Sequence, residues 1–373
     1  MQAPPRNAPP QNNDARVGQT GWKVEHGKCR YYNAPRKALQ LPSIVDIPCA
    51  LRAVPNAIVT PQRRSSVDAT KRISGAVYDS DGQIIEECRF SDGPDNPRSV
   101  WAENSPNVAI DRTKDMRRVE GTCLYLGGFR RHFGHFMLES LARAWGLIGL
   151  DPDVRLIYHG SEFLVPAFGM AMLRMLDVEP MRIVDYNEAI VVERLLVPSS
   201  QFHYYQRASL GMCRAFDAMR LRADRDVVTE SLPKKIYLSR REHEAAIALG
   251  NGKEQARWRK TRGLNEAEVE ALFVARGFTV VAPEKLPIQA QIQLLSRATH
   301  IAGLTGTALH SILFNDDPDA CLIAIDGRHS VNQMLVDAVR GVNSHHIYCA
   351  SERNDAGWRI DTGIVAKALE EIL

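Results

Sequence analysis

Short apolar runs alternate with helix-like segments from residue 121 to residue 373, and this alternation is the dominant pattern of the sequence. In the first part of this region, strands are expected at residues 122–126, 154–159, 183–184 and 189–198, and helices at 132–149, 164–176 and the second half of 202–225. Strands that alternate with helices are typical of a parallel sheet with helices on its faces. The pattern therefore predicts an α/β fold.

A second set of alternating elements begins at Lys235. Strands are expected at residues 236–238, 278–281, 299–302, 320–325 and 345–349, and helices at 265–276, 287–298, 307–315, 332–342 and 362–373. The first of these helices begins at Asn265 and has Glu268 three residues on, which is a capping-box-like pattern. Residues 239–263 are polar and basic, and we expect them to form a loop.

The chain before residue 110 has a different character. β-like pieces at residues 57–60, 75–78 and 83–90 are separated by Pro, Gly and Asp turns, and residues 1–20 have the composition of a disordered leader. We therefore expect two Rossmann-like domains that face a cleft. The first spans residues 21–225, with a β-rich lead-in to about residue 110, and the second spans 235–373, closed by the helix at 362–373, with a linker at 226–234.

Composition excludes several classes of protein. The chain is 45% hydrophobic with a net charge of +3, and its arginines are mixed with acidic residues, so no nucleic-acid-binding surface is expected. Seven cysteines without a close pair give no zinc spacing and favour reduced thiols in a cytoplasmic protein. No apolar run reaches 18 residues, so no membrane span is expected. Peripheral association with the inner face of a membrane stays open, although no basic amphipathic helix requires it.

The strand at 299–302 leads into a turn with two glycines, Gly303 and Gly306, and then into an apolar helix expected to begin near Thr307. Backbone N–H groups at such a corner, with the positive end of a helix dipole, suit an anion such as a diphosphate. The alternative is an ordinary connection that uses glycine for a tight turn. The sequence has no GxGxxG motif or P-loop.

The expected helix at 132–149 carries His135, Glu139 and Arg143 at intervals of four residues, so the three share one face. A histidine held by a carboxylate is a candidate general base, because the acid fixes its tautomer. One alternative is a Glu139–Arg143 ion pair beside a histidine that fills the first turn. Another is a metal site formed by His132, His135 and Glu139, although their spacing is not H-E-x-x-H.

Two further candidates follow expected strands. Arg240 and Arg241 come just after the strand at 236–238, where planar guanidinium groups can bind phosphate, or can pair with acidic neighbours in a solvated loop. Asp326 follows the strand at 320–325, where a carboxylate often binds ribose hydroxyls or simply caps a turn.

In this order the segments GHFMLESLARAW, IYLSRR and RGLNEAEVEALFVARGFTVVAPEKLPIQAQIQLLSRATHIAGLTGTALHSILF resemble glycosyltransferase family 61, over roughly residues 120–350. The resemblance implies a GT-B fold, with a nucleotide sugar bound mainly by the C-terminal domain. It also implies inverting transfer without an obligatory metal or other cofactor. The residues that match family positions are His135, Arg240, Arg241, Asn265, Gln291, Gly303, Gly306 and Leu309.

The chain departs from the family pattern at two positions. Thr305 stands where the glycine loop of the family usually has histidine, so a hydroxyl replaces a group that can carry charge; His310, about one turn on, is a candidate to compensate. Asp326 stands where the family often has glutamate.

The hypothesis is therefore an inverting glycosyltransferase that moves a sugar from a nucleotide sugar to a hydroxyl of a glycan or glycoconjugate acceptor. His135, supported by Glu139, is the expected base. The leaving diphosphate is expected to bind Arg240, Arg241, the N–H groups of residues 305–308 and the hydroxyls of Thr305 and Thr307. The alternatives are a degenerate binding subunit of a polysaccharide-assembly complex and a glycoside hydrolase, which needs two facing carboxylates. The sequence does not specify the sugar, nucleotide, acceptor, linkage or oligomeric state.

Overall fold

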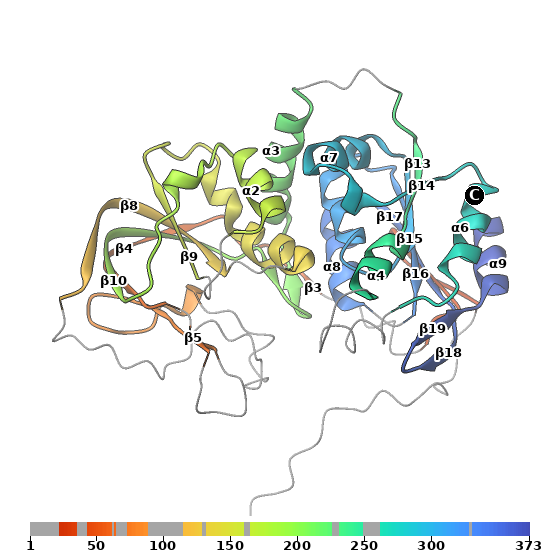
Figure 1. Cartoon of the computed structure of the whole chain (residues 1–373), viewed down its shortest axis with the longest axis horizontal. Coiled ribbons are helices and arrows are strands. Elements are labelled where there is room, and N and C mark those ends of the chain that lie inside the picture. Colours follow the sequence, from red (N-terminus) through yellow and green to blue (C-terminus); the bar gives the residue numbers. More distant parts are fainter. Residues whose placement is uncertain are drawn as a thin grey trace, which may run out of the picture.

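A computed structural model describes residues 22–35, 43–61, 63–64, 73–88, 115–128, 132–159, 165–225, 231–248, 262–327 and 330–373. The expected leader at 1–20, the first part of the expected linker and most of the basic loop before residue 262 lie outside the described residues. The described part is a mixed α/β structure built around two main sheets (Figure 1).

The larger sheet has seven strands in the order β1-β2-β17-β16-β15-β13-β14. These strands are β1 (Lys23–His26), β2 (Cys29–Tyr32), β13 (Lys235–Leu238), β14 (Thr279–Val281), β15 (His300–Leu304), β16 (Cys321–Asp326) and β17 (Asn343–Tyr348). All neighbouring pairs are parallel except β1 with β2, which form a hairpin. Since the carboxyl ends of the parallel strands meet at one edge, the loops that follow them are brought together.

Helices cover both faces of this sheet (Figure 1). On the face toward the smaller sheet lie α7 (Ile288–Arg297) and α8 (Val331–Arg340), whose apolar residues join a core cluster shared with the N-terminal half of the chain. On the opposite face lie α6 (Glu266–Val274) and α9 (Thr362–Ile372), which pack in a separate cluster. Burial on both faces explains why β15 and β16 are almost continuous apolar runs.

The smaller sheet has five strands in the order β7-β4-β10-β8-β9. They are β4 (Leu51–Val59), β7 (Val77–Tyr78), β8 (Arg117–Gly128), β9 (Arg155–His159) and β10 (Ile190–Pro198). Strands β8, β9 and β10 are parallel, whereas β4 is antiparallel to β10. The helical turns at residues 136–147 pack against β8 and β10 on its inner face, near α2 (Ala167–Arg174), and α3 (Cys213–Ala223) contacts both these turns and α7 (Figure 1).

Several short elements complete the described structure. They are the strands β3 (Ser43–Ile44), β5 (Arg63–Arg64), β6 (Ile73–Ser74), β11 (Phe202–His203), β12 (Arg207–Ala208), β18 (Ala350–Asn354) and β19 (Gly357–Ile360), and single 3₁₀ turns at Glu86–Cys88, Pro180–Arg182, Leu210–Met212 and Pro283–Lys285. The strand expected at 83–90 is therefore wrong at its centre, where the chain forms the 3₁₀ turn Glu86–Cys88.

Three other expectations need correction. The helix expected at 132–149 is irregular: a single α-turn, α1 (Phe133–His135), leads into a π-helical turn (Phe136–Ser140) and then 3₁₀ turns (Leu141–Leu147). The expected loop after Leu238 begins with a helix, α4 (Arg241–Ala248). The helix expected at 307–315 is a 3₁₀ helix that begins at Leu309 and ends at Phe314.

The N-terminal hairpin β1–β2 belongs to the C-terminal sheet, although the sequence placed residues 21–110 with the N-terminal domain. Tyr31 and Tyr32 explain this position, because both are fully buried on opposite faces of β2. Tyr32 joins the α6–α9 cluster, whereas Tyr31 packs with Met334 of α8. A strand with aromatic side chains on both faces needs a layer above and below the sheet, and the α6–α9 cluster and α8 supply these layers.

Candidate functional site at the strand ends

Three of the predicted residues follow the carboxyl ends of neighbouring parallel strands. Arg240 follows β13, Thr305 follows β15, and Asp326 ends β16. In the registers of these strands Leu238 pairs with Gly303, and Leu304 pairs with Ile325. The three side chains are therefore brought to one edge of the seven-stranded sheet, the edge at which ligands bind in open α/β sheets.

The glycine turn lets Arg240 approach the backbone. Arg240 Nη1 lies 3.2 Å from the position that a Cβ atom on Gly306 would occupy, so a side chain there would press on the guanidinium. The N–H of Thr305 donates to the Ile325 carbonyl oxygen at 3.0 Å. The next three N–H groups, at residues 306–308, form no hydrogen bond with another described residue. They are donors at the same corner as the guanidinium of Arg240, a combination that suits an anion.

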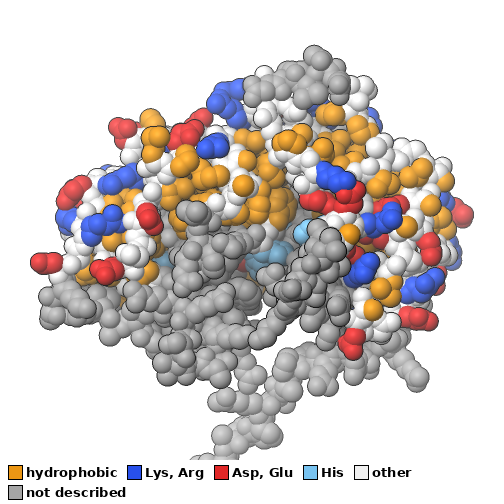
Figure 2. Space-filling model, in the orientation of Figure 1, with side chains coloured by type: hydrophobic (Ala, Val, Ile, Leu, Met, Phe, Trp, Pro, Cys, Tyr) orange, Lys and Arg blue, Asp and Glu red, His pale blue; other side chains and the backbone are white. Residues whose placement is uncertain are grey.

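The GHF turn of the N-terminal half packs directly against this glycine turn. A Cβ atom on Gly134 would lie 2.3 Å from Thr307 Cγ2 and 3.4 Å from His310 Cδ2, so only glycine fits. The two motifs, 170 residues apart in the sequence, are thus in contact. Histidine side chains are visible together near the middle of one face of the molecule, between the two sheets (Figure 2).

His135 and Glu139 form the expected pair. His135 Nδ1 is hydrogen-bonded to Glu139 Oε1, and the glutamate is almost fully buried, whereas the histidine side chain is 23% exposed. The His135 ring also stacks on Tyr204, with centroids 5.1 Å apart and planes 8° apart, and meets the ring of His132 edge-on. A carboxylate at Nδ1 makes this atom the donor, so the neutral ring has its lone pair on Nε2. Tyr204 was not predicted as a site residue, because it lies in the turn between β11 and β12, where no local sequence pattern indicates a site.

Arg143 does not form the ion pair with Glu139 that the spacing allowed. Its buried guanidinium donates from Nη2 to the Glu87 carbonyl oxygen at 3.0 Å and lies over the ring of Tyr125. The π-helical turn changes the four-residue register between these positions, which removes the shared face that a regular helix would give. In the described residues no group of three potential ligands is placed to hold a metal ion, so His132, His135 and Glu139 do not form such a cluster.

The two adjacent arginines point to different partners. Arg240 lies by Gly306, with its side chain 12% exposed and Nη2 4.0 Å from Glu244. Arg241 is 57% exposed at its side chain and forms an ion pair with Glu270 at 3.0 Å. Only Arg240 is thus directed to the glycine turn. Arg262, from the basic loop, pairs with Glu244 at 3.1 Å.

Asn265 and Gln291 make contacts within the C-terminal half. The Asn265 amide accepts from the Ile360 N–H at 2.8 Å and donates to the Ile360 carbonyl oxygen and to Glu268. Its oxygen therefore joins α6 to β19, and the expected cap of the helix N–H groups is not formed. Gln291 donates to the Leu286 carbonyl oxygen at 2.9 Å.

A buried carboxylate lies beneath Arg240. Glu266 Oε1 accepts hydrogen bonds from the Arg240 N–H and the Tyr237 hydroxyl, both at 3.2 Å. Burial is the main cause, and together with nearby Glu244 and Glu270 it raises the pKa of Glu266 to about 7, against the lowering effects of Arg240 and its N–H. Glu266 was not among the predicted site residues, since it has the pattern of an ordinary first-turn acid.

This pKa predicts a pH-dependent effect of Glu266→Gln. Because the pKa is raised on folding, the wild-type protein gains stability from this group below about pH 4.5 and loses it as the pH rises through about 7. We expect the free energy of unfolding of the variant, relative to wild type, to increase by up to about 3 kcal/mol between pH 4.5 and pH 8. Urea unfolding at several pH values measures it. Glu268→Gln, at an exposed side chain, is the control, and a parallel pH course for both variants would contradict the prediction.

A chain of buried hydrogen bonds runs under the glycine turn. The Thr305 hydroxyl donates to Asp326 Oδ1, and Asp326 Oδ2 meets His346 Nδ1 at 2.8 Å. His346 Nε2 meets Asp337 Oδ2 at 2.9 Å. Gln333 Nε2 lies 2.7 Å from Asp337 Oδ1 and continues the chain. Gln333 Oε1 lies 2.9 Å from Nδ1 of His310, which is the sixth and last residue of the chain.

The chain holds one cation between two acidic side chains. Burial tends to lower the pKa of His346, but Asp326 and Asp337 outweigh it and raise the pKa to about 10, so the ring is an imidazolium between two carboxylates. Burial raises the pKa of Asp337 and lowers that of His310 to about 4. Both oxygens of Asp326 therefore have hydrogen-bond partners within the protein. Two sequence signals for this buried chain were available: the polar residues on the buried face of α8, and two adjacent histidines in a buried strand.

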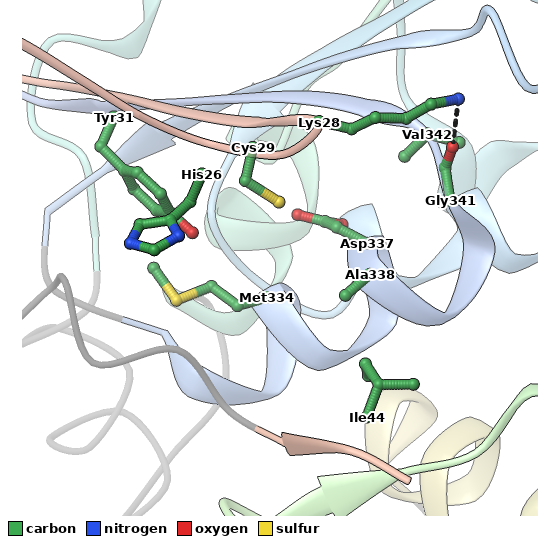
Figure 3. A pocket seen from close by; sticks show the side chains of 10 residues that line it. All are labelled: His26, Lys28, Cys29, Tyr31, Ile44, Met334, Asp337, Ala338, Gly341 and Val342. Carbon is green, nitrogen blue, oxygen red and sulfur yellow. Dashed lines mark hydrogen bonds between the residues drawn. The ribbon is translucent and has the colours of Figure 1, made fainter. Parts of the chain in front are cut away.

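A cavity of about 340 Å³ lies between α8 and the β1–β2 hairpin (Figure 3). It is lined by His26, Lys28, Cys29, Tyr31, Ile44, Met334, Asp337, Ala338, Gly341 and Val342. Lys28 is directed away from its centre and donates to the carbonyl oxygens of Gly341 and Pro318. The cavity is thus separate from the strand ends. Of the six residues of the buried chain, Asp337 alone also lines the cavity.

Comparison with known proteins gives one family. The sequence model of the family described as Glycosyltransferase 61 matches residues 133–323, just over half of the chain, from the GHF turn to β16. No curated protein matches the chain. Within the described residues, no helix is both long enough and apolar enough to cross a lipid bilayer.

Proposed function

The chain belongs to glycosyltransferase family 61, and from this premise we propose that it moves a sugar from a nucleotide sugar to a hydroxyl of a glycan or glycoconjugate, with inversion at the anomeric carbon. The observation that carries the proposal is the contact between the GHF turn and the glycine turn. It puts a histidine–carboxylate pair beside an anion-binding corner. A base next to a leaving-group site is what an in-line displacement needs.

In this proposal the diphosphate binds at the glycine turn. Arg240 and the N–H groups of residues 306–308 neutralise the charge that develops on the leaving group, and the Thr307 hydroxyl is a further donor. Thr305 acts less directly, because its hydroxyl donates to Asp326 and so fixes the turn. A nucleotide would then lie along the carboxyl edge of the seven-stranded sheet, as in a GT-B fold.

The acceptor side is assigned to the N-terminal half. His135 Nε2 would take the proton of the attacking hydroxyl, while buried Glu139 holds Nδ1 and stabilises the imidazolium that forms. No step of this scheme uses a metal or a further cofactor. We place the reaction in polysaccharide or surface-glycan synthesis in the cytoplasm, at or near the inner face of the membrane, since nucleotide sugars are its co-substrates.

Thr305 supports one second candidate, a degenerate subunit that binds a nucleotide or glycan without turnover. Its hydroxyl is neutral, so it brings no positive charge to the leaving group, and its proton is donated to Asp326. Transfer to an acceptor separates this candidate from an enzyme. A glycoside hydrolase is less well supported, because it needs two carboxylates that face one sugar, whereas Glu139 is paired with His135, and Asp326 is paired with Thr305 and His346.

A panel of nucleotide sugars and free nucleoside diphosphates tests the proposal by thermal shift. A ligand at a hundredfold excess over Kd raises the free energy of unfolding by about 2.7 kcal/mol. We expect Arg240→Ala to weaken binding of the best diphosphate by roughly 10- to 150-fold, because a hydrogen bond to a charged group is lost. Arg241→Ala, its neighbour that pairs with Glu270, should change affinity less than twofold. Equal losses in the two variants would refute this placement of the diphosphate.

A further inference from the structure

The hydrogen bonds around Gln333 determine the protonation of His310. The Gln333 side chain is fully buried and contacts three polar groups: the Leu309 carbonyl oxygen at 3.3 Å, Asp337 Oδ1 at 2.7 Å and His310 Nδ1 at 2.9 Å. A backbone carbonyl can only accept a hydrogen bond. The amide nitrogen of Gln333 must therefore face Leu309, whatever the protonation of Asp337.

This orientation leaves Gln333 Oε1 toward His310. An amide oxygen only accepts, so His310 Nδ1 must carry the proton. The ring is then the Nδ1–H tautomer with its lone pair on Nε2, as long as it is neutral. Complete burial, the main effect, and the nearby rings of His132 and His135 lower the pKa of His310 to about 4, so it stays neutral near pH 7.

The unprotonated side of the His310 ring faces the junction of the two motifs. Cδ2, the atom bonded to Nε2, lies 3.4 Å from the Cβ position of Gly134, and the hydrogen bond to Gln333 is the only one that the His310 ring makes among the described residues. A lone pair at this place attracts a hydroxyl. It cannot donate to a phosphate oxygen, so His310 does not replace the charge that Thr305 lacks.

We propose that Gln333 is a positioning residue that holds His310 as an acceptor for a sugar hydroxyl, either of the transferred sugar or of the acceptor. The tautomer follows from the contacts of Gln333, whereas the role of the hydroxyl rests on the proposed function. Asp337 accepts a hydrogen bond from the Gln333 amide nitrogen and is itself held by His346, so it fixes the orientation of the amide.

Nitrogen-15 NMR of the full chain labelled at histidine tests the tautomer without any ligand. His310→Asn identifies the signals of His310. In the wild-type protein we expect a protonated Nδ1, an unprotonated Nε2 and no titration between pH 5.5 and pH 8. A proton on Nε2, or an imidazolium at pH 7, would overturn the inference even if the protein is an active transferase.

Two variants test the role of Gln333. Gln333→Met removes the acceptor and should let the His310 tautomers exchange. Gln293→Met removes another buried glutamine, one that donates to the Ala223 carbonyl oxygen, and should leave the His310 signals unchanged. A His310 signal that is the same in Gln333→Met as in the wild type would overturn the positioning role.

Binding measurements with UDP, GDP, UDP-glucose and GDP-mannose then separate the two sources of the hydroxyl. Gln333→Met should leave the affinity for free UDP or GDP within twofold. Weaker binding of the sugar nucleotide assigns the hydroxyl to the transferred sugar, and a raised KM for the acceptor alone assigns it to the acceptor. A tenfold loss of affinity for the free diphosphate would place His310 at the phosphates and contradict the proposal. A lack of any nucleotide binding would count against the proposed function and leave the tautomer result intact.

Discussion

Alanine at position 135 is expected to lower the rate of sugar transfer by roughly 10²–10⁴-fold, the usual contribution of a general base, with nucleotide affinity nearly unchanged. The reason is the division of the site. His135 lies on the N-terminal side with Glu139 at Nδ1 and Tyr204 against its ring, whereas the predicted diphosphate contacts come from Arg240 and the glycine turn. Initial rates at saturating donor, with Kd for the nucleotide measured by calorimetry, test both parts.

Two further variants make this test specific. Glu139→Gln keeps an oxygen that can accept from Nδ1 but removes the charge, so its rate should fall less than that of His135→Ala. His300→Ala removes an imidazole at the opposite end of β15 and should leave the rate unchanged. Equal loss of transfer and of nucleotide binding in His135→Ala would assign this histidine to binding and exclude it as the base.

The sequence predicted the parallel strands of the larger sheet because each is a local apolar run. The strands expected at 236–238, 299–302 and 320–325 agree with β13, β15 and β16 to within two residues at each end. The glycine corner was visible for the same local reason, since Gly303 and Gly306 stand where the chain must pass close to Leu238 and Arg240. Such short-range signals depend on few distant contacts.

Long-range contacts were not predictable in this way. Strand β2 pairs with β17, from which more than 300 residues of sequence separate it, and no pattern in residues 23–32 indicates this pairing. The same limit applies to the buried chain, in which Gln333, Asp337 and His346 act together only after α8 and β17 are placed beside β16. Arg240 and Arg241 looked equivalent in the sequence. Because α4 begins at Arg241, the two side chains point in different directions.

His346→Leu is expected to lower the free energy of unfolding by about 3–5 kcal/mol, the cost of breaking a buried ion pair. The substitution leaves Asp326 and Asp337 buried without the cation that lies between them, at 2.8 Å and 2.9 Å from their oxygens. Because folding raises the pKa of His346 to about 10, its contribution is complete below about pH 6.5 and is lost as the pH rises through about 10. The difference between wild type and variant should therefore be largest at pH 6.5 and shrink toward pH 10.

The neighbouring residue of β17 gives a matched control. His345 is also buried, but it shares one hydrogen bond with the Tyr32 hydroxyl at 3.2 Å, and burial lowers its pKa to about 4, so it is neutral. His345→Leu should cost only about 1–2 kcal/mol, without the loss of the effect toward pH 10. Urea unfolding at pH 6.5, 8 and 9.5 compares the two variants. Adding Asp326→Asn and Asp337→Asn to His346→Leu removes the uncompensated charges and should recover part of the stability. If the triple variant were no more stable than His346→Leu, lost packing rather than buried charge would be the cause.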